Sequence, residues 1–148
     1  MTAFSFPPHN RFSTAAFGLG LLSPPSLPHS VLVFGNNSLR WWEFLPIHYI
    51  GITDVPFGGV YIVARAEPWV PSGLLSPVNG VSVGTTFVRF GYVGEAGVIG
   101  SRHQYHEHKD RFSRFGADVA LLLQVESETL RKEIEADIIA RYEPSLNA

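Results

Sequence analysis

The stretch Phe90–His106, FGYVGEAGVIGSRHQYH, decides the fold that we expect for this chain. Alternating apolar residues predict a strand from Phe87 to Val93, and Gly94 and Gly97 predict a turn after it. Beyond the turn, residues recur at helical spacing, namely Val98, Arg102, Tyr105, Lys109 and Phe112. The stretch therefore predicts a strand, a turn and one helix.

Three polar side chains of this stretch form a candidate site. Arg102 and His106 are four residues apart, so a helix presents both on one face, about one turn apart. Tyr92 places an aromatic hydroxyl near the end of the strand that precedes this helix. A phenol that faces a guanidinium and an imidazole is suited to handling a phosphate group. The alternative is a half-buried strand with a solvated helix behind it.

The rest of the chain predicts further elements on both sides of this stretch. The predicted strands are Ser30–Phe34, a partly extended segment Arg40–Ile50 that Pro46 interrupts, Val60–Ala66 and Ala117–Val125. Residues 1–29 read as an irregular arm, and residues 67–86 as a long excursion between two strands. The order of elements predicts an α+β fold, an α/β sandwich in which helices flank a small, mostly antiparallel sheet.

The last predicted element is a helix from Ser127 to Tyr142. Ser127 is a good N-cap, because its hydroxyl can accept a hydrogen bond from the first turn. The predicted core stripe of this helix is Leu130, Ile134, Ile138 and Tyr142. Glu135 lies beside that stripe, so we expect its carboxylate to be partly buried.

A cluster of aromatic residues precedes Pro46. We expect Trp41, Trp42 and Phe44 to cover one side of the core, because buried aromatic residues are far commoner than exposed stacking platforms. The alternative is a base-stacking role in contact with nucleic acid.

Length and composition exclude several classes of protein. A chain of 148 residues, 45% of them hydrophobic and 13% aromatic, is expected to form one globular domain. Without cysteine it has no disulfide, no thiolate nucleophile and no sulfur-ligated zinc, which fits a reducing compartment. No apolar run approaches the roughly 20 residues that span a membrane. Prolines crowd the apolar segment Ala15–Leu22, so we expect a cytoplasmic protein with no membrane partner.

Charge is distributed unevenly along the chain. The formal net charge is −2, which is low for a protein that coats nucleic acid. Four cationic residues nevertheless fall in one short segment, namely Arg102, Lys109, Arg111 and Arg114. A locally basic helix on a mildly acidic protein suits contact with a few phosphates. The alternative is an ordinary solvated face of mixed charge.

The spacing of several residues resembles the GIY-YIG nuclease family. Gly59-Val60-Tyr61 and Tyr92-Val93-Gly94 correspond to the two halves of the family signature. Arg102 stands ten residues after the second tyrosine, and His106 stands four residues further. The end of the chain matches the family's final pattern with Glu135, Ile138, Ile139, Pro144 and Asn147. The resemblance covers residues 57–148, with an insertion at 67–86, and leaves residues 1–56 as an N-terminal arm with accessory strands.

The resemblance implies a role for each matched residue. Tyr61 would deprotonate or orient the attacking water, and Arg102 would hold a phosphate oxygen with two donors. His106 would relay a proton or bind the phosphate. Glu135 would hold one Mg²⁺ or Mn²⁺. Tyr92 and Asn147 would orient these groups at the rim. The expected substrate-binding residues are Lys109, Arg111 and Asn147.

A zinc site is an alternative for the histidine-rich segment that holds His103, His106, Glu107 and His108. The pairs His103–His106 and His103–Glu107 suit one helical face, but HExxH is absent and a third ligand is not obvious.

Three features depart from the family pattern. Glu95 follows the second signature glycine where many members have lysine, residues 67–86 lengthen the separation between the two half-motifs, and the overall charge is low. Two functions are therefore expected as alternatives. The first is a metal-dependent endonuclease that hydrolyses phosphodiester bonds in DNA. The second is a nucleic-acid-binding or assembly module with the same fold and weak or absent hydrolysis.

Overall fold

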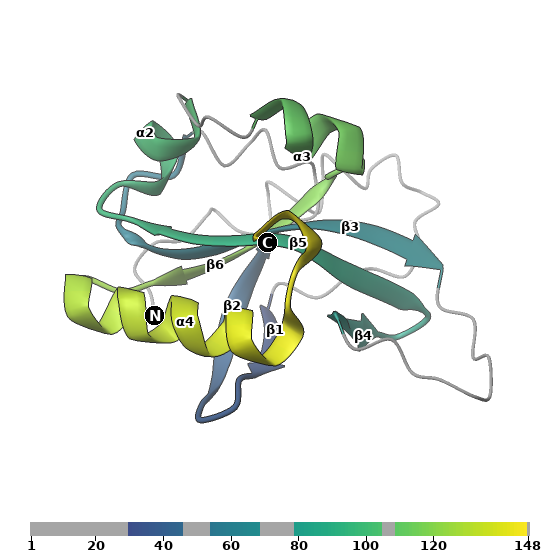
Figure 1. The fold of residues 1–148 in the computed structure, drawn as a ribbon, viewed down its shortest axis with the longest axis horizontal. Helices are drawn as coiled ribbons and strands as arrows, with labels where there is room; N and C mark the ends of the chain where they lie inside the picture. Colours follow the sequence, from purple (N-terminus) through teal and green to yellow (C-terminus); the bar gives the residue numbers. More distant parts are fainter. Residues whose placement is uncertain (1–29, 46–53, 69–78, 105–108, 148) are drawn as a thin grey trace.

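The computed structural model describes residues 30–45, 54–68, 79–104 and 109–147. Six antiparallel strands form one curved sheet in the order β1-β2-β6-β3-β5-β4 (Figure 1). The strands are β1 (Ser30–Phe34), β2 (Leu39–Leu45), β3 (Gly59–Pro68), β4 (Gly80–Val83), β5 (Thr86–Ala96) and β6 (Val119–Gln124). The α-helices are α2 (Ile99–Gln104), α3 (Lys109–Phe115) and α4 (Glu128–Tyr142), and a 3-10 turn, η3 (Ser145–Asn147), follows them.

The predicted α+β class and the antiparallel sheet are confirmed. The sheet is larger than the small sheet that we expected, and it curls into a nearly closed, barrel-like surface. Strand β2 pairs with β6, so the hairpin of β1 and β2 extends the same sheet that contains β3 and β5. The segment 67–86, expected as an excursion, supplies the end of β3 and the edge strand β4.

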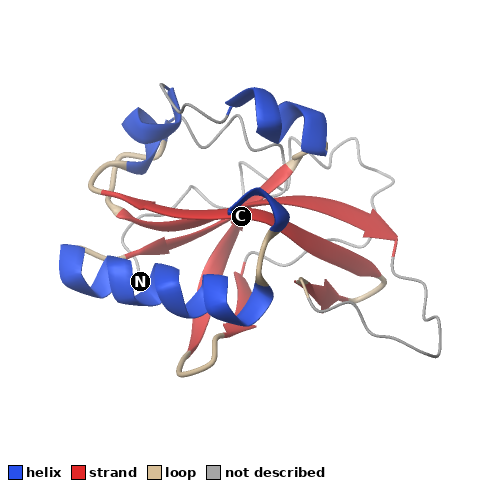
Figure 2. Cartoon of the chain, viewed as in Figure 1, coloured by secondary structure: helices blue, strands red, loops and turns tan. Residues whose placement is uncertain are grey.

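Helices cover both faces of the sheet, with α4 on one side and α2 and α3 on the other (Figure 2). Strand β3 is buried along both faces at its start, so its alternate side chains enter two different cores. Val60 and Ile62 pack on the α4 side. Tyr61 and Val63 pack on the side of α2 and α3. This alternation places the first signature tyrosine under α2.

Helix α4 begins and ends as the sequence predicts, but its buried stripe differs. Ser127 caps it by accepting a hydrogen bond from the Leu130 amide at 3.1 Å. Glu143 ends it in the left-handed conformation, with φ of 47°. Leu130 is 36% exposed, and the buried residue of that turn is Arg131. The prediction was wrong at this turn, because Arg131 has polar partners that satisfy its charge inside the protein.

The segment from Phe87 to Phe112 differs from the prediction in two respects. Strand β5 runs to Ala96, so Gly94 lies inside the strand, where it pairs with Tyr61, and the turn starts at Gly97. The single helix that we expected consists, among the described residues, of the two short helices α2 and α3. His106 lies between them, outside the described residues, so no shared helical face with Arg102 is established.

The aromatic cluster of β2 is split between the two faces of the strand. Trp42 and Phe44 are almost fully buried, whereas Trp41 is 64% exposed. The prediction for Trp41 was wrong, because neighbouring residues of a strand point to opposite faces.

Candidate active site

Strands β3 and β5 bring the two signature tyrosines together. Tyr61 pairs with Gly94, and Tyr92 lies on the same face two residues away, with 6.2 Å between the ring centroids. The missing side chain of Gly94 makes room for the Tyr61 hydroxyl, since a Cβ there would overlap the phenol oxygen. The register thus fixes the position of the Tyr61 hydroxyl.

A β-bulge at Gly91 adjusts the direction of Tyr92. The pairing changes from Val63–Tyr92 to Ala64–Phe90, which leaves Gly91 as the extra residue of β5. A Cβ at Gly91 would meet the Phe115 ring at 2.7 Å, so α3 packs directly on the bulge. Tyr92 contacts Phe112 of the same helix at a centroid distance of 5.3 Å.

Several charged and polar groups of the site act on the pKa of the Tyr61 phenol. Burial raises the pKa of Tyr61 well above its ordinary value, and Tyr92 and Glu135 add to that rise. The charge of Arg102 and its hydrogen bond to the phenol lower the pKa only in part. The raised pKa keeps the hydroxyl of Tyr61 protonated at neutral pH, and the residue is 0% exposed.

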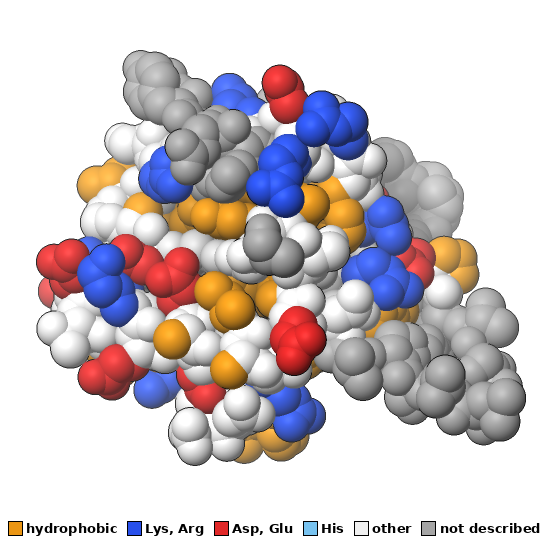
Figure 3. Space-filling view, in the orientation of Figure 1, with side chains coloured by type: hydrophobic (Ala, Val, Ile, Leu, Met, Phe, Trp, Pro, Cys, Tyr) orange, Lys and Arg blue, Asp and Glu red, His pale blue; other side chains and the backbone are white. Residues whose placement is uncertain are grey.

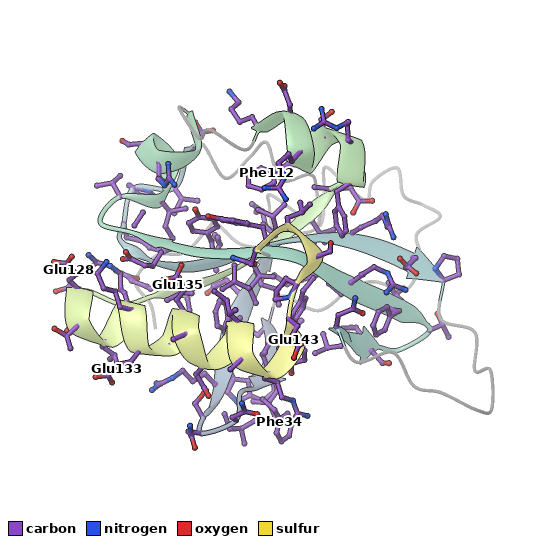
Figure 4. All side chains as sticks on the ribbon, in the orientation of Figure 1. Phe34, Phe112, Glu128, Glu133, Glu135 and Glu143 are labelled. Carbon is purple, nitrogen blue, oxygen red and sulfur yellow. The ribbon has the colours of Figure 1, made fainter. Side chains whose placement is uncertain are left out.

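Glu135 approaches these residues from the other side of the sheet. It is half-buried on α4, and Figure 4 shows it on the side of the helix that faces β5. Burial raises the pKa of its carboxyl group, Glu95 raises it further, and Lys132 opposes both effects. Its charge also acts on Tyr61 and raises the pKa of that phenol.

Asn147 closes the outer edge of β5 at Val93. Beyond the end of β4, the outer backbone groups of Val93 have no neighbouring strand among the described residues. The Asn147 amide replaces such a strand, accepting from the Val93 N–H at 2.8 Å and donating to its carbonyl at 2.9 Å. Both polar atoms of this side chain are therefore bonded to β5. This geometry suits an orienting role for Asn147, and its expected role in substrate binding stays a prediction.

The remaining predicted residues lie on α2 and α3. Arg102 is partly exposed on α2 and hydrogen-bonds the buried phenol of Tyr61. On α3, Lys109 is exposed and Arg111 is half-buried. His106 lies outside the described residues, so its predicted role stays a prediction. The structure brings Tyr61, Tyr92 and Arg102 together, and the charge of Glu135 reaches Tyr61 from α4.

No cluster of three His, Asp or Glu side chains that could hold a metal ion is present in the described ranges. Glu95, the departure from the family pattern, bonds Arg131 and Lys132. Burial raises the pKa of Glu95, but these two hydrogen bonds outweigh it and keep the pKa below the ordinary value. The zinc alternative falls mostly on residues outside those ranges.

Sequence reasoning did not foresee the role of Arg131 or the contact between Gly94 and Tyr61. Helical spacing places Arg131 next to the apolar stripe, and that position is the signal that was present in the sequence. For Gly94, the signal was its place as the glycine of the second signature. The sequence does not show the strand register that pairs Gly94 with Tyr61.

Comparisons with other proteins add no further relationship. No protein-family model, curated protein or solved structure matches this chain. None of the described helices is long and apolar enough to cross a membrane. The family resemblance therefore rests on the spacing of the residues in the sequence.

Proposed function

We propose that this protein is a metal-dependent endonuclease of the GIY-YIG type that hydrolyses phosphodiester bonds in DNA. The observation that carries the proposal is that Tyr92 lies beside Tyr61 on the paired strands β3 and β5, while Arg102 hydrogen-bonds the Tyr61 phenol and the charge of Glu135 acts on it. These four residues come from β3, β5, α2 and α4, and the sequence pattern named all of them. Phosphodiester hydrolysis needs a cation for the phosphate, a carboxylate for a metal ion and groups that orient both.

Arg102 is the group that reaches the substrate phosphate. Its guanidinium carries two parallel donors for phosphate oxygens, and the residue is partly exposed while bonded to Tyr61. The protonated, buried phenol is poorly suited to act as a base. Tyr61 therefore works as a positioning residue, which fixes the direction of Arg102 and, through it, of the attacking water.

Glu135 fits a single divalent cation. Its half-buried carboxylate has a raised pKa, and within the described residues no lysine or arginine forms an ion pair with it. A cation there relieves the cost of a buried negative charge, and one carboxylate leaves room for water and phosphate oxygens. When bound, Mg²⁺ or Mn²⁺ would supply a water of lowered pKa and neutralise charge on the phosphate.

The surface charge favours a polyanion on the side of α2 and α3. Figure 3 shows basic side chains gathered over these helices and a group of acidic side chains near the start of α4. Among the described residues of α2 and α3, the cations are Arg102, Lys109, Arg111 and Arg114, and the acid is Asp110. DNA on this face would end at Glu135, where a divalent cation offsets the local acidity.

Plasmid nicking tests the proposal. We expect cleavage with Mg²⁺ or Mn²⁺, none with EDTA, and a loss of roughly 100-fold or more in both Glu135→Gln and Arg102→Ala. Exposed residues of α4 provide matched controls, so Glu133→Gln and Arg141→Ala are expected to cleave at the wild-type rate. Equal cleavage by Glu135→Gln and Glu133→Gln would contradict the assignment.

The burial of Tyr61 favours the second candidate function, a nucleic-acid-binding module with weak or absent hydrolysis. A phenol that is 0% exposed contacts no substrate in this conformation. DNA binding by the wild type without metal-dependent nicking, unchanged in Glu135→Gln, would support the module over the enzyme.

A further inference from the structure

A charge cluster joins β5 to α4 next to Glu135. Glu95 Oε1 accepts a hydrogen bond from Arg131 Nε at 2.9 Å, and Glu95 Oε2 accepts one from Lys132 Nζ at 3.1 Å. The Glu95 side chain is 15% exposed and that of Arg131 is 11% exposed, so this pair is shielded from water. Arg131 also donates to the Glu126 carbonyl at 2.8 Å, which ties it to the start of α4.

Lys132 has three acidic neighbours, and Glu95 holds it most closely. The next contact, to Glu128 Oε2, is 3.8 Å long and lies at the exposed first turn of α4. Glu135 follows Lys132 by three residues on the same helix, a spacing that brings side chains into contact. Lys132 nevertheless makes no ion pair with Glu135, although the two charges influence each other.

We propose that Glu95 keeps Glu135 open for a divalent cation by holding the Lys132 ammonium away from it. This inference rests on the proposed function, because it concerns the same carboxylate. Without the Glu95 charge, Lys132 is left with an exposed contact to Glu128 and turns toward the half-buried Glu135. An ammonium there neutralises the carboxylate and competes with the metal ion.

The arrangement explains how an acid at position 95 is compatible with binding a phosphate and a cation. The charge of Glu95 is neutralised by two basic side chains of α4, so it does not oppose the substrate as a free anion. Figure 4 shows Glu128 at the start of α4 and Glu135 further along, on the side toward β5. Glu95 is thus a positioning residue, which acts on the cation through Lys132.

Titration of the metal-free protein with Mn²⁺, followed by electron paramagnetic resonance, tests the inference without any cleavage assay. We expect Glu95→Gln to weaken Mn²⁺ binding by about tenfold, because Lys132 then competes for Glu135. In the double variant Glu95→Gln/Lys132→Gln, affinity is expected to return to within about threefold of wild type. Lys132→Gln alone is expected to change affinity by less than about threefold, since Glu95 already occupies the lysine.

Glu135→Gln separates this inference from the proposed function. If Glu135→Gln binds Mn²⁺ as wild type does, the cation site at Glu135 is wrong and the proposed function loses its metal. If Glu135→Gln loses binding but Glu95→Gln does not, or if Lys132→Gln fails to rescue, only the role of Glu95 is overturned. Should Glu95→Gln fail to fold by circular dichroism, Lys132→Gln decides. A gain of about tenfold in that variant would overturn the role of Glu95, because it would mean that Lys132 already competes in the wild type.

Discussion

Gly94 is the residue on which the position of the Tyr61 hydroxyl depends. It faces the phenol oxygen across the pairing of β3 and β5, and no larger side chain fits there. We expect Gly94→Ala to lower stability by about 1–3 kcal/mol, because the buried ring has to move or the strands have to separate. Cleavage is expected to fall at least about tenfold, since Arg102 loses its oriented partner. Thermal unfolding and plasmid nicking measure the two effects.

Gly97 provides the control for that substitution. It lies three residues further along, and the nearest atom to a Cβ there is Arg131 Nη2 at 3.9 Å, an ordinary contact. Gly97→Ala is therefore expected to change stability by less than about 0.5 kcal/mol. If the two alanine variants are equally stable and equally active, the close packing of Tyr61 on Gly94 has no functional importance.

Glu135 predicts a pH dependence of stability. Its pKa is raised in the folded protein by burial and by Glu95, so the folded state holds this proton more tightly than the unfolded state does. Stability from this group is therefore present below the ordinary glutamate pKa and is lost as pH rises through the folded pKa. We expect Glu135→Gln to melt at a higher temperature than wild type at about pH 7, by roughly 1–3 °C, with the gap closing at about pH 4. The metal-free protein is used, because a bound cation would reverse the sign. A lower melting temperature for Glu135→Gln at neutral pH would contradict the raised pKa.

Among the elements, η3 covers the outer edge of β5 at Val93. The outer backbone groups of Val93 are bonded only by the amide of Asn147 within the described residues. Asn147→Asp replaces the donor to the Val93 carbonyl with an oxygen, so one bond is lost and two oxygens face each other. We expect a loss of about 1–3 kcal/mol and faster hydrogen exchange at the Val93 amide. Ser145→Ala, at an exposed position of the same turn, is the control and is expected to leave both unchanged.

The sequence predicts elements well where one physical signal dominates. Helix α4 has a cap, a stop and a period, and the structure confirms its bounds. Apolar continuity likewise predicts β6, which is buried on both faces between β2 and β3. Elements whose limits depend on pairing were predicted less well. Glycine usually ends a strand, yet Gly94 continues β5 because Tyr61 needs the space opposite it.

For the candidate site too, the sequence predicts which residues belong to it better than it predicts their burial and pairing. Residue spacing named Tyr61, Tyr92, Arg102 and Glu135. The structure places the two tyrosines side by side and Arg102 on the Tyr61 phenol, whereas Glu135 acts on that phenol only through its charge. Spacing could not give the burial of Tyr61, because that depends on how α2 and α3 cover the sheet. Spacing could not give the pairing of Glu95 with Arg131 either, because these residues are far apart in the sequence and β6 lies between them.

At the scale of the whole molecule, the separation of charge determines how a polyanion approaches. The net charge of −2 disfavours nucleic acid, but α2 and α3 carry four cations against one acid, whereas α4 carries four acids against three cations. Association therefore depends on local potential, which falls off over about 8–10 Å at physiological salt. We therefore expect a charge substitution near α2 and α3 to change the affinity for DNA, and the same substitution on α4 to change it less.

Arg114 and Arg141 are a matched pair for that test. Both are exposed arginines near the C-terminal end of a helix, Arg114 on α3 and Arg141 on α4. Arg114→Glu and Arg141→Glu change the net charge equally, yet we expect only Arg114→Glu to weaken binding to a DNA duplex, by about tenfold at about 0.1 M salt. The slope of log affinity against log salt is expected to fall by about 0.9 for each phosphate that this variant no longer neutralises. Fluorescence anisotropy across a salt series measures both quantities. Equal losses in the two variants would mean that net charge alone governs binding, and a loss confined to Arg141→Glu would place the DNA over α4, away from Arg102.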